Sequence, residues 1–184
     1  MSGRNDLLSR CLLKEPKAQE ELYMLYKAKV MGLCRRYARN KAEAEDIYQE
    51  TFIRVFRSLN QLNDASSLES WIKRIAVNTA LNYYHQTKRH NHIPERNGHH
   101  YPSEAYNEIL SRLSDEMLIG IINELPDGYR MVFNLHEVEG YSHQEIGSML
   151  NISEATSRSQ LNRAKQALRN KLKQFGVLKY ESYE

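Results

Sequence analysis

The sequence predicts an all-α protein, made of two small helical domains joined by a flexible linker, with a helix-turn-helix in the C-terminal domain. Apolar residues recur at helical spacing along most of the 184 residues, and no alternating run is long enough to indicate a strand. Between Gln86 and Glu108 this spacing stops, in a segment that holds two of the four prolines and four histidines. Helical spacing resumes afterwards, so each side has apolar residues for a core of its own.

The N-terminal domain is expected to span residues 1–88. Helical stripes of apolar residues cover 7–12, 22–37, 44–59 and 68–83. The first is expected to end near Pro16, and Asn40 is expected to close the second. The third begins with acidic residues and collects Arg54 and Arg57 near its end, as the helix macrodipole favours. Together the four stripes predict one bundle-like domain.

The expected linker spans residues 89–110, and the C-terminal domain spans residues 111–184. In the latter, EIGSMLNISEATSRSQLNRA (145–164) is typical of two short helices separated by a turn. Asn151 lies where the left-handed backbone of a turn is tolerated, and Ser153 is suited to cap the second helix. This layout predicts a helix-turn-helix, whose second helix enters a DNA major groove.

The second helix of this motif carries many hydrogen-bond donors. The candidate DNA-reading residues are Ser153, Thr156, Arg158, Ser159, Gln160, Asn162 and Arg163. Arginine bridges the acceptors of guanine, glutamine and asparagine pair with adenine, and serine and threonine hold phosphates. The alternative is a solvated polar face on an ordinary pair of helices, because helix-turn-helix spacing alone is a weak filter.

The fourth stripe interleaves aromatic, basic and amide side chains. The candidate nucleic-acid-binding residues are Lys73, Arg74, Asn78, Asn82, Tyr83, Lys88 and Arg89, with Trp71 and Tyr84 beside them. Aromatic rings stack on unpaired bases while cations follow the backbone, so the segment suits single-stranded nucleic acid. In the alternative interpretation, Trp71 and Tyr83 belong to the core and the cations form a solvated face.

Composition limits the partners and the compartment. The net charge of +3 does not itself indicate nucleic acid, but residues 153–173 hold six basic residues against one acidic residue. Cys11 and Cys34 stand singly, without the spacing of a zinc site, and are expected to be buried free thiols. No apolar run approaches the roughly 18 residues of a membrane span, and no signal peptide is evident. A cytoplasmic protein without membrane insertion of its own is expected.

Neither catalysis, a cofactor nor a metal is expected. The linker histidines His90, His92, His99 and His100 invite a metal site. However, no HExxH motif, carboxylate triad or cysteine partner accompanies them, and a Pro-containing linker does not hold ligands in place. No nucleophile has an adjacent base, and no Gly-rich phosphate loop is present. His136 and His143 flank the helix-turn-helix and are interpreted as surface or hinge residues.

Three segments closely resemble the extracytoplasmic-function (ECF) group of alternative bacterial sigma factors. They are AEDIYQETFIRVFRSL, SWIKRIAVNTALNYYHQTKR and ELPDGYRMVFNLHEVEGYSHQEIGSMLNISEATSRSQLNRAKQAL. The first two resemble region 2 of that family and the third resembles region 4, in the same order and with the same gap. The resemblance implies a factor that binds core RNA polymerase, directs it to promoters by their −35 and −10 elements, and promotes DNA melting.

The resemblance also implies partners and site residues. Region 2 would bind the β′ clamp helices and capture an unpaired −10 base, region 4 would read the −35 element and contact the β-flap, and an anti-sigma factor is an expected partner. Asp46, Gln49, Glu50 and Phe52 match the acidic, polymerase-binding helix. Lys73, Arg74, Asn78 and Asn82 match positions facing the −10 strand, and the loop 60–70 is expected to form the base pocket. Arg158, Ser159, Gln160 and Arg163 match the −35-reading helix.

Two residues depart from the family pattern. Ser157 stands where an aliphatic core residue is usual, and is expected to leave the reading helix less firmly seated. Gln160 stands where arginine is usual, which leaves the base preference at that position open. The alternative function is a stand-alone helix-turn-helix transcription regulator. It would share the C-terminal half, but it leaves residues 71–89 unexplained, and no dimerisation helix is evident after Leu172.

Overall fold

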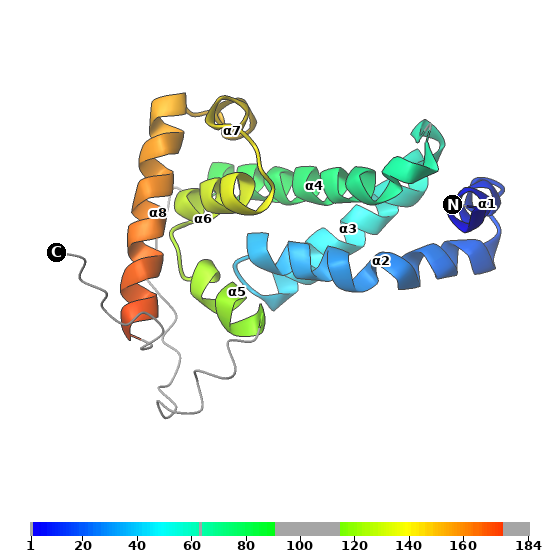
Figure 1. Cartoon of the computed structure of the whole chain (residues 1–184), viewed down its shortest axis with the longest axis horizontal. Helices are drawn as coiled ribbons and strands as arrows, with labels where there is room; N and C mark the ends of the chain where they lie inside the picture. The colour runs from blue at the N-terminus through cyan, green and yellow to red at the C-terminus, as the bar shows by residue number, and fades with distance from the viewer. Residues whose placement is uncertain (1, 63, 91–114, 175–184) are drawn as a thin grey trace. The chain divides into compact units, whose positions relative to one another are not determined.

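The computed structural model describes residues 2–62, 64–90 and 115–174 (Figure 1). Every regular element in these ranges is helical, which confirms the all-α prediction. The chain divides into two compact units, Met1–Asn91 and His92–Glu184. From residue 91 onward the predicted linker (89–110) lies outside the described residues, and residues 89 and 90 are the last of a long helix.

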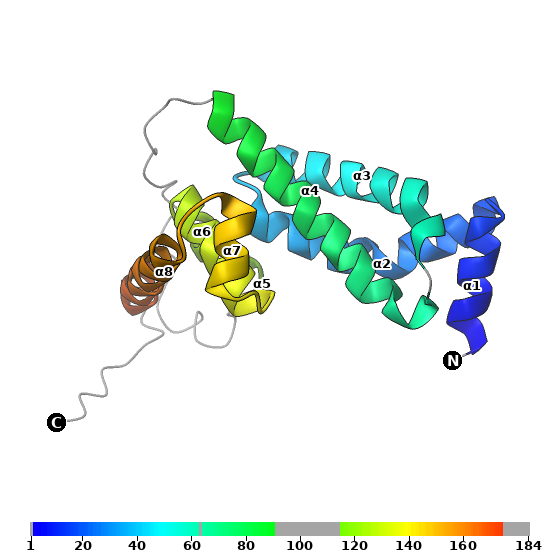
Figure 2. The same cartoon turned by 90° about the horizontal axis from the view of Figure 1, so that it is seen from above.

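The first unit packs its helices around one apolar core (Figures 1 and 2). Its helices are α1 (Ser2–Leu12), α2 (Pro16–Tyr37), α3 (Lys41–Ser58) and α4 (Leu68–His90). Helices α2, α3 and α4 contact one another in pairs, and α1 packs on α2. The largest side chains that they bury include Leu22, Tyr37, Ile47, Val55, Leu68, Ile72 and Val77. The four predicted stripes therefore form the predicted bundle.

The turn between α2 and α3 differs from the prediction. Helix α2 ends at Tyr37, and Asn40 caps α3 instead of closing α2. The Asn40 side chain accepts a hydrogen bond from the Glu43 backbone N–H at 2.9 Å, and Glu43 accepts one from the Arg39 backbone N–H at 2.8 Å. An asparagine at this position stabilises a helix by about 1 kcal/mol. Because asparagine favours both ends of helices, the sequence alone did not distinguish these two roles.

Two short 3₁₀ turns, η1 (Leu59–Gln61) and η2 (Ala65–Ser67), connect α3 to α4. Asp64 caps η2, since its carboxylate accepts hydrogen bonds from the hydroxyl and the backbone N–H of Ser66. These bonds lower the pKa of the Asp64 carboxyl. The apolar side chains below the turns are buried: Leu59, Leu62 and Ala65. The described part of the predicted base-pocket loop is therefore an ordered pair of turns anchored against α1.

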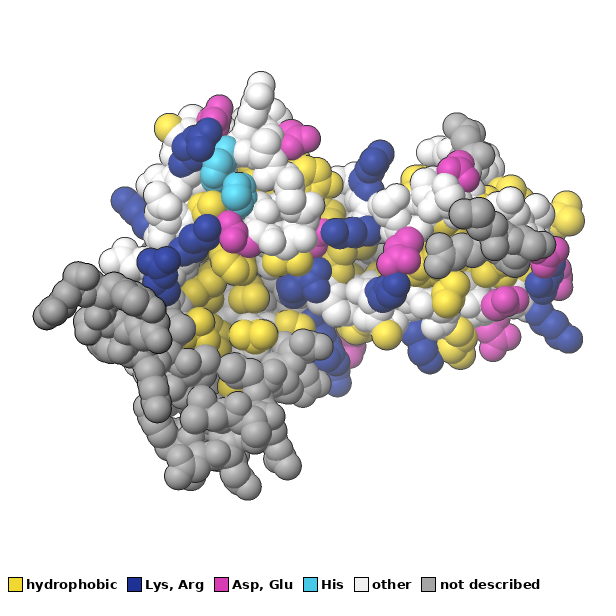
Figure 3. Space-filling model, in the orientation of Figure 1, with side chains coloured by type: hydrophobic (Ala, Val, Ile, Leu, Met, Phe, Trp, Pro, Cys, Tyr) yellow, Lys and Arg dark blue, Asp and Glu magenta, His cyan; other side chains and the backbone are white. Residues whose placement is uncertain are grey.

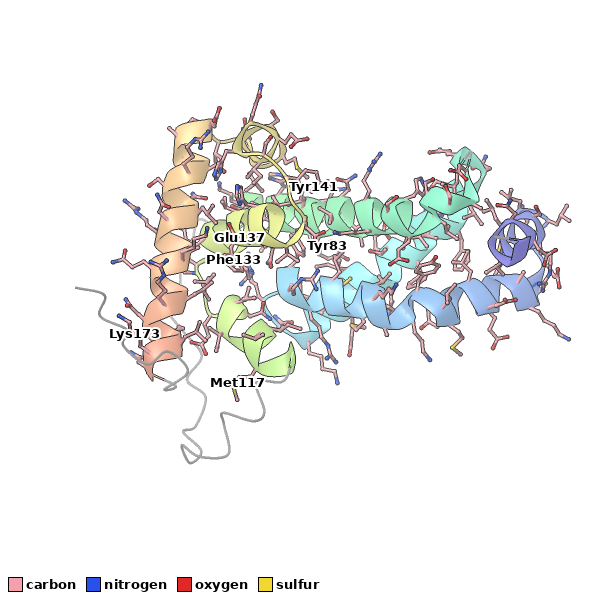
Figure 4. The ribbon with its side chains drawn as sticks, viewed as in Figure 1. Tyr83, Met117, Phe133, Glu137, Tyr141 and Lys173 are labelled. Atoms are coloured by element: carbon pink, nitrogen blue, oxygen red, sulfur yellow. The ribbon has the colours of Figure 1, made fainter. Side chains whose placement is uncertain are left out.

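The second unit contains the helix-turn-helix. Its elements are α5 (Asp115–Asn123), α6 (Asp127–Phe133), the π-helical turn η4 (Asn134–Val138), α7 (His143–Leu150) and α8 (Glu154–Gln174). Helix α8 contacts α5, α6 and α7. Its core cluster comprises Ile121, Leu125, Ala164 and Leu168, with Met117, Phe133 and Leu172 packed against it. Met117 and Phe133 are labelled in Figure 4. One face of α8 is therefore fixed by apolar contacts, which leaves the other face free for a ligand.

Backbone contacts build the turn between α7 and α8. Asn151 has φ 54° and ψ 51°, the left-handed conformation predicted for it. Ser153 caps α8, because its hydroxyl oxygen accepts a hydrogen bond from the Thr156 backbone N–H at 3.0 Å. Gly147 permits a close approach of the two helices, since a Cβ atom there would lie 2.8 Å from the Ile152 carbonyl oxygen. The sequence interpretation predicted the turn and its cap, but not the requirement for glycine.

The two cysteines, Cys11 and Cys34, are buried free thiols as expected. Burial raises the pKa of the Cys34 thiol to about 12, and it also raises the pKa of Cys11. Within the described ranges, no helix combines the length and the apolar character needed to span a bilayer.

Candidate nucleic-acid interfaces

Most of the predicted DNA-reading residues lie on the solvent face of α8. The exposed ones are Ser153, Thr156, Arg158, Ser159, Asn162 and Arg163. The opposite face, with Leu161 and Ala164, is buried. At the start of the helix the hydroxyl oxygens of Ser153 and Thr156 lie 2.8 Å apart, beside the N-terminal N–H groups that favour an anion such as phosphate. The first turns of α8 therefore present donors without loss of core packing.

The two arginines of this face lie on different flanks of α8. The Arg158 guanidinium donates to the Glu154 carboxylate one turn earlier, and the Arg158 side chain is 62% exposed. Arg163 Nη1 donates to the Tyr129 hydroxyl of α6 at 3.3 Å. Exposed ion pairs are worth about 0–1 kcal/mol, so Arg158 can exchange Glu154 for a phosphate or a base at small cost.

Gln160 is less accessible than the other candidates. It is half-buried, and its amide lies against α6, where a Cβ atom added at Gly128 would be 3.3 Å from Gln160 Nε2. Its Oε1 is buried and has no hydrogen-bond partner among the described residues. In this conformation Gln160 faces α6, so a base contact requires its side chain to turn outward.

Ser157, the departure from the family pattern, has a specific partner. Its hydroxyl oxygen is buried on α8 and lies 2.9 Å from Nδ1 of His143 on α7. His143 in turn stacks on His136 of η4, with ring centroids 4.4 Å apart and 22° between the ring planes. The serine therefore replaces the usual apolar contact by a polar one. The two histidines, interpreted from sequence as surface or hinge residues, are half-buried and belong to the contact between α7, η4 and α8.

Arg74, Asn78 and Asn82 form one exposed row along α4, because residues four apart share a helix face. Beside Asn78 lies a hollow of about 280 Å³ between α3 and α4. The hollow is lined by Arg54, Arg57, Ser58, Ile75 and Asn78. Lys73 lines a different hollow, between α2 and α4. The structure thus brings three of the predicted −10 residues together and leaves Lys73 apart from them.

The remaining α4 candidates differ in exposure. Tyr83 is half-buried, and burial together with the nearby carboxylates of Asp46 and Glu50 raises its pKa, so its ring belongs to the contact between α3 and α4. The side chain of Tyr83 is labelled in Figure 4. Lys88 is exposed, with Nζ 5.8 Å from the centre of the Tyr84 ring, a cation–π distance. The Arg89 side chain lies outside the described residues, so its role stays a prediction.

An acidic surface with one apolar side chain lies on α3. Asp46 and Gln49 are exposed, and Glu50 is half-buried and pairs with Arg54 at 2.7 Å. Ile53 lies one turn from Gln49 and is 44% exposed. An exposed isoleucine among acids suits a protein partner better than DNA. Sequence reasoning missed Ile53 because an apolar residue is assigned to the core by default, although it is out of phase with the buried Ile47 and Val55.

Phe52, predicted to bind polymerase, is only 5% exposed. Its ring centre lies 4.8 Å from that of Tyr23 on α2 and 5.1 Å from that of Tyr48. Aromatic pairs at such distances stabilise by about 0.5–1.5 kcal/mol beyond the area that they bury. Phe52 therefore packs in the core beneath the acidic surface and stabilises the contact between α3 and α2.

A metal centre has no support in the described ranges, where no group of three or more His, Cys, Asp or Glu side chains could hold a metal ion. The linker residues His92, His99 and His100 lie outside those ranges, as does the side chain of His90. For these histidines the expectation of no metal stays a prediction.

Two family models match the chain, Sigma-70 region 2 over residues 22–90 and Sigma-70 region 4 over residues 115–168. The ECF RNA polymerase sigma-E factor of Haemophilus influenzae is 30% identical over 177 residues, which cover 90% of this chain and 93% of that protein. The chain belongs to the ECF family of sigma factors. The sigma-E factor of Escherichia coli K12 is also 30% identical, and the RNA polymerase sigma-H factor of Pseudomonas aeruginosa is 29% identical over 88% of this chain and 90% of its own.

Solved structures of low identity share the fold of this sigma factor. One is CnrH in complex with the cytosolic domain of CnrY, with a TM-score of 0.50 and 17% identity, covering 94% of this chain and 98% of that one. Another is the sigma factor RpoE in complex with the anti-sigma factor NepR from Bartonella quintana, with a TM-score of 0.52 and 18% identity. That match covers 84% of this chain and 96% of the RpoE chain.

As a sigma factor, the protein binds core RNA polymerase, directs it to promoters through the −35 and −10 elements, and promotes DNA melting for initiation. The region 2 match covers most of α2 and all of α3 and α4, and so includes residues 71–89, which a stand-alone helix-turn-helix regulator left unexplained. The main prediction is therefore confirmed over that alternative.

Proposed function

We propose that the two units of this sigma factor bind two different forms of promoter DNA. The C-terminal domain, predicted over residues 111–184, reads the −35 element as intact duplex. The N-terminal domain, predicted over residues 1–88, holds the −10 element as an unpaired strand and docks on core polymerase. The observation that carries this division is the pair of exposed donor rows, on α8 and on α4, whose side chains suit these two forms of DNA.

Reading of the −35 duplex rests on the outward face of α8. A major groove admits one helix, and the residues near its N-terminus reach the base edges. Ser159, Asn162 and Arg163 lie there with exposed side chains, and Ser153 and Thr156 hold a phosphate at the helix start. Arg158 contributes after release from Glu154, and Gln160 contributes only after it turns away from α6.

Capture of the unpaired −10 strand rests on α4. Extraction of a base from the duplex costs a few kcal/mol, so its partners must be held in place before it arrives. Asn78 and Asn82 provide amides for base edges on a rigid helix, and Arg74 provides a cation for the backbone. The hollow beside Asn78 adds two further guanidinium groups. The described turns of loop 60–70 precede this row and provide the wall of the pocket, while Tyr83 of α4 packs against α3.

Docking on core polymerase rests on the α3 surface formed by Asp46, Gln49, Glu50 and Ile53. Exposed carboxylates steer a basic partner and set its orientation, and a central apolar side chain supplies the desolvated contact that contributes most to affinity. The β′ clamp helices are the proposed partner of this surface, and the β-flap is the proposed partner of the C-terminal domain.

A regulatory partner and a compartment complete the proposal. RpoE of the same fold has been solved with the anti-sigma factor NepR. An anti-sigma factor that covers the polymerase-binding surface would keep this chain inactive in the same general way. The protein acts in the cytoplasm, where bacterial polymerase transcribes. It has no catalytic activity of its own, since RNA synthesis belongs to the polymerase.

The division of function is tested with polymerase holoenzyme on the promoter duplex that the wild-type holoenzyme selects from a randomised pool. Arg158→Ala should weaken duplex binding by about 1–3 kcal/mol if the contact is to a base, and should spare melting once the DNA is bound. Asn78→Ala should leave duplex binding nearly intact and reduce the open complex, because its partner exists only after the strands separate. Filter binding and permanganate footprinting of the −10 thymines measure the two steps.

Gln166→Ala is the matched control, since Gln166 is exposed on α8 one turn beyond Asn162. It should change neither step. Equal losses of binding and melting in both Arg158→Ala and Asn78→Ala would refute the division between the two units.

A further inference from the structure

Ser157 is a polar side chain on the buried, otherwise apolar face of the DNA-reading helix α8. It is 0% exposed and lies in line with the buried Leu161 and Ala164 of α8. A hydroxyl buried without a partner destabilises a protein, but here the Ser157 hydroxyl lies 2.9 Å from His143 Nδ1 on α7. The two helices of the motif are therefore joined by a directional bond at the point where the family usually has an apolar contact.

This bond belongs to a polar chain that returns to α8. His143 stacks on His136 with ring centroids 4.4 Å apart, and His136 Nδ1 lies 2.9 Å from Glu137 Oε1. The same carboxylate oxygen pairs with Lys165 Nζ on α8 at 2.9 Å. Figure 3 shows the histidine pair as adjacent cyan side chains between acidic and basic ones. Ser157 and Lys165 are separated by eight residues, or about 12 Å along the helix axis. These polar contacts therefore attach α8 to α7 and η4 at two points.

We infer that Ser157 and His143 are positioning residues, which set the rotation of α8 on α7 and thereby select the base preference at the −35 element. The inference rests on the proposed function, namely that α8 reads the −35 duplex. Apolar packing is non-directional and tolerates small rotations of a helix, whereas a hydrogen bond weakens steeply when its angle changes. Base contacts require a geometry held to within about 0.5 Å and 10–20°. The hydrogen bond between Ser157 and His143 therefore fixes the positions of Ser159 and Asn162, although it does not itself contact DNA.

Protonation of His143 provides a readout that a purely structural role would not show. The titratable and charged groups around it are His136 and Glu137 from η4, and Glu154, Arg158 and Lys165 from α8. Burial, followed by electrostatic repulsion from the neighbouring His136, lowers the pKa of His143 below its ordinary value of 6.5. The neutral ring is therefore the form that the folded chain favours. Protonation of His143 places its positive charge beside Arg158 and Lys165, and this repulsion weakens the packing of α8 on α7.

Acid should therefore have opposite effects on the affinity of the protein for DNA and on its sequence specificity. Protonated histidines attract the DNA backbone, so non-specific binding should rise as the pH falls. The ratio of specific to non-specific binding should fall, because α8 loses its fixed rotation. As the pH falls below 6.5 toward the lowered pKa of His143, the two quantities should diverge in the wild-type protein.

The experiment uses holoenzyme made from the full chain and a pool of duplexes randomised over the −35 hexamer. Two variants separate the hydrogen bond of His143 from its aromatic ring and from its titration. His143→Asn places an amide near the position of Nδ1 and does not titrate, whereas His143→Phe keeps an aromatic ring for the stack and loses the bond. His143→Asn should select the wild-type sequence with no pH dependence. His143→Phe and Ser157→Ala should each reduce its enrichment about fivefold, the value of one hydrogen bond of average strength.

Three controls make the result specific. Ser148→Ala removes an exposed serine of α7 whose hydroxyl donates to the Gln144 carbonyl, and should behave as wild type. The double variant with His143→Phe and Ser157→Ala should lose no more than either single variant, because both remove the same bond. Thermal unfolding of each variant separates a lost fold from a lost preference.

The outcomes distinguish failure of the positioning role from failure of the proposed −35 reading. If the wild type enriches a sequence and both Ser157→Ala and His143→Phe enrich it equally well, the positioning role is wrong while the proposed function stands. If His143→Asn keeps the pH dependence, the titrating group is not His143. If the wild-type holoenzyme enriches no −35 sequence, the proposed function fails, and the inference fails with it.

Discussion

Replacement of Gly147 by alanine should destabilise the second unit and leave the first unit unchanged. Gly147 lies inside α7, and an added Cβ would be 2.8 Å from the Ile152 carbonyl oxygen and 3.6 Å from the Glu154 backbone nitrogen. The obstacle is backbone and not the end of a flexible side chain, so the turn itself must move. The Gly147 carbonyl also accepts hydrogen bonds from the N–H groups of Asn151 and Ile152, and the same movement lengthens them.

The size of the effect follows from these contacts. Overpacking against fixed atoms costs about 1–3 kcal/mol, and here the upper end applies because the contact is with backbone. Weakening of one backbone hydrogen bond adds about 1 kcal/mol, and the better helix propensity of alanine offsets about 1 kcal/mol. A net loss of about 3 kcal/mol lowers the melting temperature of a unit of this size by more than about 10 °C.

Thermal unfolding of the full chain tests this prediction with two probes. The single tryptophan, Trp71, reports on the first unit by fluorescence and should be unaffected. Hydrogen exchange of the α7 and α8 amides reports on the second unit and should become faster. Gly120→Ala is the matched control, because a Cβ there meets no atom within 4 Å and the same unit should be unchanged or slightly stabilised. Equal midpoints for Gly147→Ala and Gly120→Ala would refute the steric argument.

Four further predictions concern binding and stability. Glu154→Gln should tighten −35 binding about two- to threefold, because Arg158 no longer has to leave a surface ion pair, and weaker binding in a filter assay would contradict this. Ile53→Ala should weaken binding to core polymerase by at least about 1 kcal/mol without lowering the melting temperature, and unchanged affinity by titration would exclude Ile53 from the interface. The free energy of unfolding of the second unit should fall as the pH drops through 6.5 toward the lowered pKa of His143, because the unfolded chain then binds more protons, and His143→Asn should remove that slope in denaturant titrations. A chain that ends at His90, the last residue of α4, should remain helical by circular dichroism and still bind core polymerase, and an unfolded fragment would show that the first unit depends on the rest.

The sequence by itself determined the fold class, the two units and the family. Helical spacing is a local property of the chain, so the stripes of α2, α3 and α4 were predictable from the periodicity of their apolar residues. The turn at Asn151 and the cap at Ser153 depend on the intrinsic preferences of single residues, and both were predicted correctly. Motif order needs no coordinates, and it led to the family that the comparisons confirm.

The tertiary structure decided which candidate side chains share a surface. Phe52 is buried by Tyr23 of another helix, Lys73 lies away from the row that contains Asn78, and Gln160 faces α6. Ile53 is exposed although it is apolar. In each case the outcome depends on the neighbouring helix and its crossing angle, which periodicity within one helix does not contain.

The hydrogen-bond partner of Ser157 could not be predicted from the sequence either. From the sequence, a serine at an apolar position predicts weaker packing of α8. His143 lies fourteen residues earlier, in a different helix. Only the packing of α7 on α8 brings Nδ1 to within 2.9 Å of the hydroxyl and His136 onto the ring. A hydrogen bond between helices requires both a distance and a direction, and these are properties of the packed chain, because backbone geometry within either helix leaves them undetermined.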